Sequence, residues 1–131
     1  MSIKIENLSY TYAQGSAYEI HALKNLNLEI EEGQFVGIIG HTGSGKSTLI
    51  QLLDGLIKAD EGHIYYNGED IYAQGYSLRS LRGKVGLVFQ YPEYQLFETT
   101  VLKDAAYGPQ NQGFSEKEAL EKAKEALIRV K

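Results

Sequence analysis

The stretch Phe35–Thr48, FVGIIGHTGSGKST, decides the fold of this 131-residue chain. Its first five residues form an apolar run, as expected for a strand covered on both faces of a parallel sheet. The next eight, Gly40–Ser47, match G-x-x-x-x-G-K-[ST] at every fixed position. From Leu49 on, apolar residues recur at helical spacing. A phosphate-binding loop belongs between such a strand and such a helix, so we predict an α/β fold around it.

The fixed residues of the loop, and the additional Gly43, have physical roles. Gly40, Gly43 and Gly45 let the backbone turn successive N–H groups toward one anion, where side chains would crowd it. The start of the following helix adds its positive end at the same place. We therefore predict that Lys46 reaches the β- and γ-phosphates of a nucleotide and that the hydroxyl of Ser47 binds Mg²⁺.

Residues beside the loop complete the candidate site. Tyr12 ends the first expected strand, a placement suited to stacking on adenine, although a tyrosine packed at a sheet edge also fits. Gln90 ends a second apolar strand, Val85–Phe89, where its carboxamide is suited to bind Mg²⁺ and position a water, or is an ordinary polar terminator. The predicted nucleotide-binding residues are Tyr12, Gly40, His41, Thr42, Gly43, Ser44, Gly45, Lys46, Ser47 and Thr48, with Ser47 and Gln90 as magnesium ligands.

Two of these residues carry narrower expectations. His41 occupies a variable position of the loop, so it is expected to contact nucleotide through its backbone and not through its ring. Thr48 is expected to add a hydroxyl near the α-phosphate.

The flanking patterns predict further strands. Apolar residues alternate from Ile3 to Tyr12 with a one-residue phase slip near Asn7, and they alternate again over Leu26–Ile30. Asn67-Gly68 is typical of a tight hairpin turn. We expect that turn to join strands His63–Tyr66 and Ile71–Tyr72.

The same reasoning predicts helices on both sides of the second apolar strand. Apolar residues at helical spacing run from Leu49 to Ile57 after the loop. A short helix is expected over Thr100–Tyr107, ending before Pro109. A further helix is expected to begin with a capping box made by Ser115 and Glu118.

Composition narrows the function classes. Apolar residues make up 43% and charged residues 23%, which is ordinary for a globular protein. The net charge of −4 argues against a nucleic-acid partner, because phosphate backbones are held by surplus Lys and Arg. The absence of cysteine excludes disulfides, thiolate metal sites and cysteine nucleophiles. No apolar run approaches the ~18 residues that span a bilayer, so membrane association is expected to come through a partner protein.

Taken together, the residues resemble the ATP-binding cassette family. The matching stretches are LSYTY, ALKNLNLEI, the phosphate loop, DEGHIYYNG and VGLVFQ, in that family's order and over nearly the whole chain. FQYPEYQLFETTVLKDAAYGPQN is similar to the ATPase subunits of energy-coupling-factor transporters. The resemblance implies a P-loop NTPase fold of the cassette type, with an N-terminal antiparallel β subdomain and the start of a helical subdomain. It implies that residues 1–131 are the N-terminal half of a truncated nucleotide-binding domain.

The resemblance also implies a function. ATP hydrolysis, with ATP and Mg²⁺ as cofactors, would be coupled to uptake of vitamins or transition-metal ions. Tyr12 would stack on adenine, and Gln90 would link the nucleotide site to the membrane subunit. The implied partners are a second ATP-binding subunit, identical or related, a transmembrane coupling subunit and a substrate-binding membrane subunit, with no nucleic acid. The implied location is peripheral, on the cytoplasmic face of the cell membrane.

The sequence departs from the family in what it lacks. It contains no LSGGQ-like signature, no apolar strand ending in Asp-Glu and no downstream switch histidine, because Asp60-Glu61 follows a helix end. The catalytic glutamate is therefore absent from this chain. We expect the 131 residues alone to bind nucleotide without turning it over, and a steady-state assay with ordinary ATPase rates would overturn this. Phe35–Ile39 and Val85–Phe89 also lack the strands that separate them in the related fold, so we expect exposed strand edges.

Three alternatives remain open at this stage. A cassette ATPase of DNA repair or translation would keep the fold without transport, and pull-down of a transmembrane protein through the segment after Gln90 would decide against it. A nucleotide-binding regulatory module would bind without hydrolysis. A P-loop kinase is disfavoured, since no acceptor-binding elements are visible.

Overall fold

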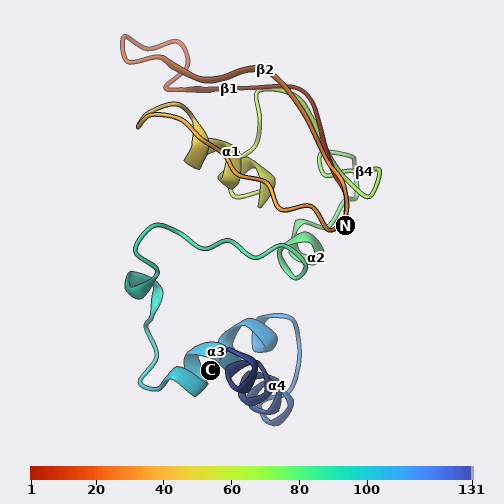
Figure 1. Ribbon diagram of the computed structural model, residues 1–131, viewed down its shortest axis with the longest axis vertical. Helices are drawn as coiled ribbons and strands as arrows, with labels where there is room; N and C mark the ends of the chain where they lie inside the picture. Colours follow the sequence, from red (N-terminus) through yellow and green to blue (C-terminus); the bar gives the residue numbers. More distant parts are fainter. Residues whose placement is uncertain (131) are drawn as a thin grey trace. The chain divides into compact units, whose positions relative to one another are not determined.

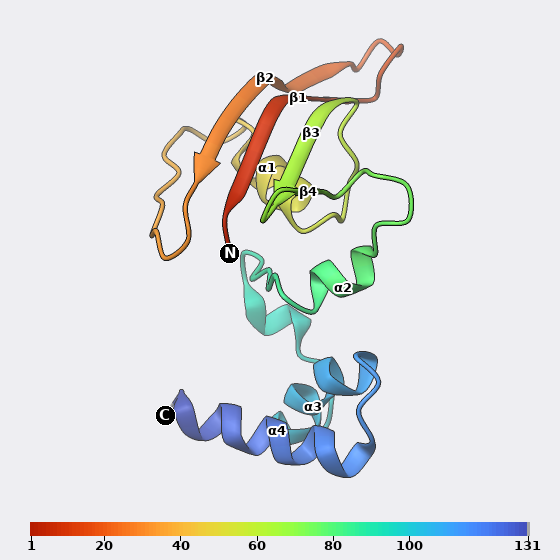
Figure 2. The ribbon, with the colours of Figure 1, turned by 90° about the vertical axis from the view of Figure 1, so that its right-hand side faces the viewer.

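The computed structural model describes residues 1–130. The chain divides into two compact units, Met1–Leu87 and a second that begins at Val88 (Figures 1 and 2). Among the described residues, the helices are all too short or too polar to cross a membrane.

The first unit is built on a four-stranded antiparallel sheet with the order β2-β1-β3-β4. Figure 2 shows the sheet face-on, with helix α1 covering one side. The strands are β1 Ile3–Tyr12, β2 Ile20–Ile30, β3 Glu61–Tyr66 and β4 Glu69–Asp70. The helices of this unit are α1 Lys46–Leu53 and α2 Leu78–Arg82. The predicted N-terminal antiparallel β subdomain is confirmed.

The predicted phase slip in β1 is a feature of the structure. Asn7 adopts a left-handed conformation with φ 49°, and the register with β2 shifts between Ile5 and Leu8. Asparagine tolerates this region better than most residues. The slip puts Ile5 and Leu8, which are an odd number of residues apart, on the same buried face. There they pack in one core with Leu52 of α1.

The predicted hairpin forms, but with a different second strand. Asn67 and Gly68 have φ of 50° and 82°, the backbone of a two-residue turn that suits strand twist. Because the turn is so short, Glu69 directly opposes Tyr66, and β4 is Glu69–Asp70 instead of the predicted Ile71–Tyr72. Ile71 instead lies in the core, where it is 3% exposed.

The prediction of two buried apolar strands is wrong for the described residues. Phe35–Ile39 and Val85–Phe89 are both irregular, and neither joins the four-stranded sheet. The exposed fractions of Phe35 and Ile39 reach 101% and 100%. A strand needs a hydrogen-bonding neighbour, and no described residue supplies one to either segment. The expected exposed strand edges are therefore not observed as such, because neither segment forms a strand in the described residues.

Helix α1 is also shorter than its apolar pattern predicted. It ends at Leu53, whereas the pattern continued to Ile57. Gly55 follows with φ 69°, and a glycine in the left-handed region is a common helix terminator. The guanidinium of Arg82 donates to the Gly55 carbonyl at 2.6 Å, which fixes the chain just beyond the helix end.

The second unit contains a 3-10 turn and two α-helices. They are η1 Pro92–Gln95, α3 Val101–Asn111 and α4 Glu116–Arg129. Ala106 of α3 packs against Ala119 and Ala123 of α4 in a small core. The predicted end of the helix before Pro109 is wrong, because α3 continues to Asn111. A proline this close to a helix end removes one hydrogen bond and leaves little helix beyond it to disrupt.

The predicted capping box at the start of α4 is confirmed. The Ser115 hydroxyl accepts from the Glu118 backbone N–H, and the Glu118 carboxylate accepts from the Ser115 N–H at 3.0 Å. The Ser115 hydroxyl also donates to this carboxylate, and that bond lowers the pKa of Glu118.

We predict that Tyr66→Phe destabilises the protein. The buried Tyr66 hydroxyl donates to the Leu53 carbonyl at 2.6 Å, and burial raises its pKa. Removing the hydroxyl leaves a buried carbonyl unpaired at the end of α1, which costs about 1–2 kcal/mol. Denaturant unfolding measures the loss. Tyr18→Phe, at a ring that is 83% exposed, is the control, and an equal effect of both changes would contradict the assignment.

Candidate nucleotide-binding site

The loop that precedes α1 has two positions whose backbone conformation favours glycine. Gly43 and Gly45 have φ of 84° and 88°, in the left-handed region. A Cβ on Gly45 would lie 2.6 Å from the Ala22 carbonyl oxygen of β2, and a Cβ on Gly40 would lie 2.5 Å from Ser44 Oγ. Gly45 therefore lets the loop pack closely on β2, and Gly40 leaves room for the side chain of Ser44. The backbone of the loop is thus compatible with the predicted phosphate cradle, and its binding role stays a prediction.

Lys46 closes the loop from the helix side. Its Nζ donates to the carbonyl oxygens of Gly40 at 2.7 Å and His41 at 2.8 Å, and to Ser44 Oγ at 3.3 Å. The ammonium group therefore lies against the backbone of the glycine loop. Gly45 caps α1 without any side-chain hydrogen bond, so the first N–H groups of the helix are not occupied by a cap. A positive side chain and free N–H donors meet at one place, which suits a phosphate.

Tyr12 and Thr48 meet beside the loop. The Tyr12 hydroxyl lies 3.1 Å from Thr48 Oγ1, which joins the end of β1 to the first turn of α1. Thr48 is only 6% exposed, whereas Tyr12 as a residue is 39% exposed. Tyr10 contacts this ring edge-on, with centroids 4.9 Å apart. The structure thus places the predicted aromatic residue next to the phosphate loop with part of its ring open.

The remaining loop residues are exposed. Ser47 lies on the first turn of α1 and Thr42 on the loop itself. The ring of His41 contacts the backbone of the next residue, with Nδ1 2.8 Å from the Thr42 carbonyl oxygen. Among residues 1–130, no three His, Asp or Glu side chains come together in a way that could hold a metal ion.

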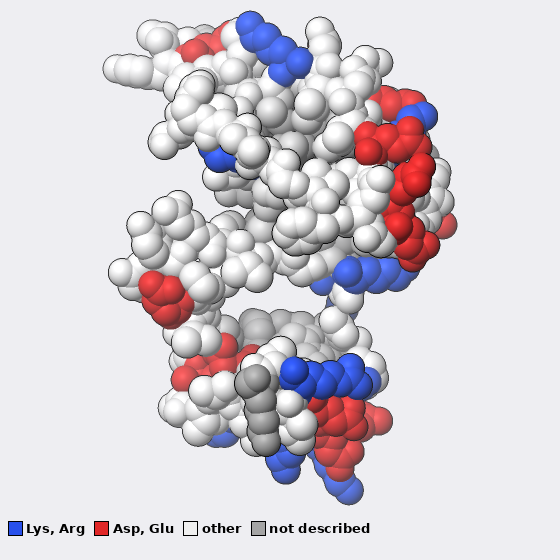
Figure 3. Space-filling view, viewed as in Figure 1, with Lys and Arg blue, Asp and Glu red and all other residues white. Residues whose placement is uncertain are grey.

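Charge around the site is uneven. A group of acidic side chains covers the right-hand side of the first unit in Figure 3, where β4 lies, and a smaller group lies at its top. Glu6 and Glu29 line an open pocket of about 410 Å³ together with Lys4. The phosphate loop contributes no acidic side chain. A triphosphate at the loop would therefore meet Lys46 without an adjacent carboxylate from the loop.

Comparison with known proteins agrees with this site. The ABC transporter family matches residues 23–131, which include the whole phosphate loop. The chain belongs to the ABC transporter family.

Several curated members of the ABC transporter family are close relatives. The energy-coupling factor transporter ATP-binding protein EcfA2 of Caldanaerobacter subterraneus subsp. tengcongensis is 58% identical over 127 residues, covering 97% of this chain and 44% of the relative. The protein of the same name from Clostridium acetobutylicum is 55% identical over 130 residues, covering 99% of this chain and 46% of the relative. The chain thus spans about half the length of the curated relatives it matches.

Solved ABC structures share the fold. The dimeric ATP-binding cassette MJ0796, bound to ADP and Pi in a post-hydrolysis state, matches with a TM-score of 0.80 and 33% identity over 96% of this chain and 56% of that one. CbiO1 from Clostridium perfringens, described as part of the ABC transporter complex CbiONQ, matches with a TM-score of 0.77 and 37% identity over 97% and 49%. The predicted cassette fold is therefore confirmed.

Gln90 is the predicted ABC site residue that lies outside the unit that carries the loop. It is exposed and irregular, just inside the second unit. The two units are not placed relative to one another, so the structure describes Gln90 only within its own segment. Its role toward Mg²⁺ and water stays a prediction.

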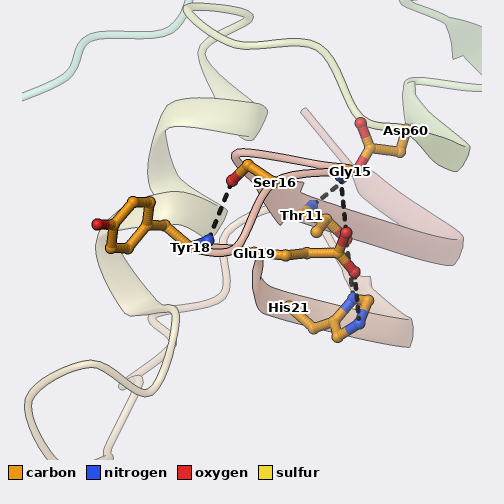
Figure 4. A network of polar contacts seen from close by, with 7 residues as sticks. All are labelled: Thr11, Gly15, Ser16, Tyr18, Glu19, His21 and Asp60. Atoms are coloured by element: carbon orange, nitrogen blue, oxygen red, sulfur yellow. Dashed lines mark hydrogen bonds and ion pairs between the residues drawn. The ribbon is translucent and has the colours of Figure 1, made fainter.

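Sequence reasoning missed a polar network beside Tyr12. Figure 4 shows Glu19, His21, Thr11 and Asp60 linked across the hairpin end that carries this tyrosine. Asp60 Oδ2 accepts from the Thr11 N–H at 2.6 Å across 49 positions of sequence. No local spacing in a single sequence signals a contact between residues so far apart.

Proposed function

We propose that residues 1–131 form the N-terminal half of an ABC nucleotide-binding domain that binds ATP with Mg²⁺. The observation that carries the proposal is the contact of Lys46 with the glycine loop at the uncapped start of α1. The coverage of about half of each curated relative supports the placement as a half domain. The chain alone would bind nucleotide without turnover.

Each residue has a proposed role in binding. The loop N–H groups surround the phosphates, Lys46 reaches the β- and γ-phosphates and Ser47 offers a hydroxyl to Mg²⁺. The open part of the Tyr12 ring stacks on adenine, with Thr48 holding its hydroxyl. Gln90 would position water and Mg²⁺ once the second unit is in place. When bound, ATP supplies the phosphoanhydride bond whose hydrolysis drives transport.

The whole protein is proposed to be the ATPase subunit of an energy-coupling-factor transporter. It would couple ATP binding and hydrolysis to uptake of vitamins or transition-metal ions. Relatives named EcfA2 at 51–58% identity and the likeness to CbiO1 of a transporter complex support this reading. We infer a peripheral position on the cytoplasmic face of the membrane, a partner ATP-binding subunit, a transmembrane coupling subunit and a substrate-binding membrane subunit.

The segment after Gln90 is the proposed docking surface for the transmembrane subunit. Its large apolar side chains point to solvent within their unit, and the exposed fractions of Tyr91, Tyr94, Leu96 and Phe97 lie between 59% and 84%. The Phe97 ring rests edge-on against Tyr107 of α3, with centroids 4.8 Å apart. That contact joins the proposed docking surface to α3. A movement of the transmembrane subunit at this surface would therefore be passed to the helix.

We predict that Tyr94→Asp abolishes membrane recruitment of the full-length protein. A charge at this exposed apolar position would be costly to bury against a hydrophobic partner. The measurement is sedimentation with vesicles that contain the transmembrane subunit, compared with empty vesicles. Tyr18→Asp is the matched control, because Tyr18 is 83% exposed and Tyr94 is 84% exposed. Unchanged recruitment of the Tyr94 variant would sink the proposed docking surface.

A further inference from the structure

The turn between β1 and β2 begins directly after Tyr12 and is held by the carboxylate of Glu19. Glu19 Oε2 accepts from the Gly15 N–H at 2.8 Å, and Oε1 lies 3.2 Å from His21 Nε2 (Figure 4). One side chain therefore joins the tip of the turn to β2. The turn also contains Ala13 at φ 51°, a conformation that a non-glycine residue keeps only when its surroundings impose it.

The contacts continue from His21 across the sheet. His21 Nδ1 lies 3.0 Å from Thr11 Oγ1, and the two residues are register partners in β2 and β1. A neutral imidazole satisfies both contacts, with Nε2–H donating to Glu19 and Nδ1 accepting from the threonine hydroxyl. The Thr11 N–H donates to Asp60, whose own N–H donates to the Ser9 carbonyl at 3.0 Å. This chain of contacts, which we call the relay, joins Glu19, His21, Thr11 and Asp60. It runs from the turn to the segment that leads into β3.

Tyr12 lies on the opposite face of the same strand end. Side chains alternate along a strand, so the neighbour Thr11 faces away from the side on which Tyr12 lies. The Tyr12 ring contacts Tyr10, two residues back on its own face, and its hydroxyl contacts Thr48 of α1. The relay and the proposed adenine contact therefore lie on opposite faces of the same end of β1.

We propose that Glu19 and His21 are positioning residues for the base end of the nucleotide, because their relay fixes the backbone that presents Tyr12. This inference rests on the proposed ATP binding. The end of a two-stranded ribbon is a place where strands open locally at little cost. Without the relay, Tyr12 would occupy its stacking position only part of the time. The apparent affinity for ATP is the intrinsic affinity multiplied by the fraction of molecules that hold Tyr12 in the stacking position.

The test distinguishes the contribution of the base to binding from the contribution of the phosphates. In the full-length protein, calorimetry measures binding of Mg-ATP and of Mg-tripolyphosphate, which has no base to stack. We expect Glu19→Ala to weaken Mg-ATP binding about 3- to 10-fold, because a modest loss of Tyr12 order is felt only by adenine. Tripolyphosphate binding is unchanged. Glu19→Gln keeps an acceptor for Gly15 and restores most of the affinity.

Two controls tie the effect to Tyr12 rather than to charge or general stability. Glu69→Ala removes an equal charge from exposed strand β4 and leaves both affinities unchanged. In a Tyr12→Ala background, Glu19→Ala has no further effect on ATP, since neighbouring residues that act as a unit are not additive.

The outcomes are distinct. Equal weakening of both ligands by Glu19→Ala, an unchanged ATP affinity, or full additivity with Tyr12→Ala would each overturn the positioning role. Failure of the proposed function itself would show separately, as wild-type protein that binds neither Mg-ATP nor Mg-tripolyphosphate.

Discussion

Lys46→Ala is expected to weaken Mg-ATP binding at least about 100-fold in an otherwise folded full-length protein, a difference of roughly 2.7 kcal/mol. The Lys46 ammonium lies against the Gly40 and His41 carbonyls at the mouth of the loop, where the phosphates are proposed to bind. A unit charge about 4 Å from a phosphate contributes roughly 4 kcal/mol near a protein surface. Desolvation of the ammonium reduces that gain, so the expected loss of binding free energy is smaller than the full charge–charge interaction.

Lys58→Ala is the control for the lost charge. Lys58 lies past the far end of α1, with its ammonium 5.9 Å from the centre of the Tyr72 ring. Removing it changes the net charge equally and leaves the loop intact, so affinity for Mg-ATP should change less than about 2-fold. Equal losses for the two variants would show that the loop lysine has no special role, and direct titration of both proteins decides.

Gly45→Ala is expected to have the largest effect on stability, about 3 kcal/mol or more. The residue sits at φ 88°, where a side chain costs about 1–3 kcal/mol. A Cβ would also approach the Ala22 carbonyl oxygen to 2.6 Å, so β2 and the loop must separate. Forced shifts of packed backbone add a further roughly 1–3 kcal/mol.

Gly43→Ala is a matched control within the same loop. Its φ of 84° is nearly the same, but no atom lies within 4 Å of the added Cβ. Only the backbone strain remains, so the expected loss is roughly 1–2 kcal/mol. Chemical denaturation of both variants measures the difference. If Gly43→Ala destabilised the protein as much as Gly45→Ala, the close approach of the loop to β2 would not be the cause.

Features that local chemistry determines could be predicted from the sequence. The phase slip near Asn7, the turn at Asn67-Gly68 and the capping box of Ser115 and Glu118 each depend on a few consecutive residues. The phosphate loop belongs to the same class, because its glycines, lysine and following helix are contiguous. Short-range preferences decide such features before tertiary contacts form.

Features that depend on distant residues could not be predicted. Phe35–Ile39 carries the pattern of a buried strand, but a strand exists only beside a partner, and none of the described residues pairs with it. The contact of Asp60 with Thr11 joins positions far apart in sequence. The continuation of α3 through Pro109 is likewise set by context, because a proline near a helix end removes only one bond.

The central claim is that the glycine loop and Lys46 form a cage for nucleoside triphosphate. Isothermal calorimetry of the full-length protein with ATP, with and without Mg²⁺, tests it most directly. The account predicts one ATP bound per chain, with affinity that requires both Mg²⁺ and Lys46. A folded full-length protein that takes up no ATP, or that binds it equally well as Lys46→Ala, would contradict the account.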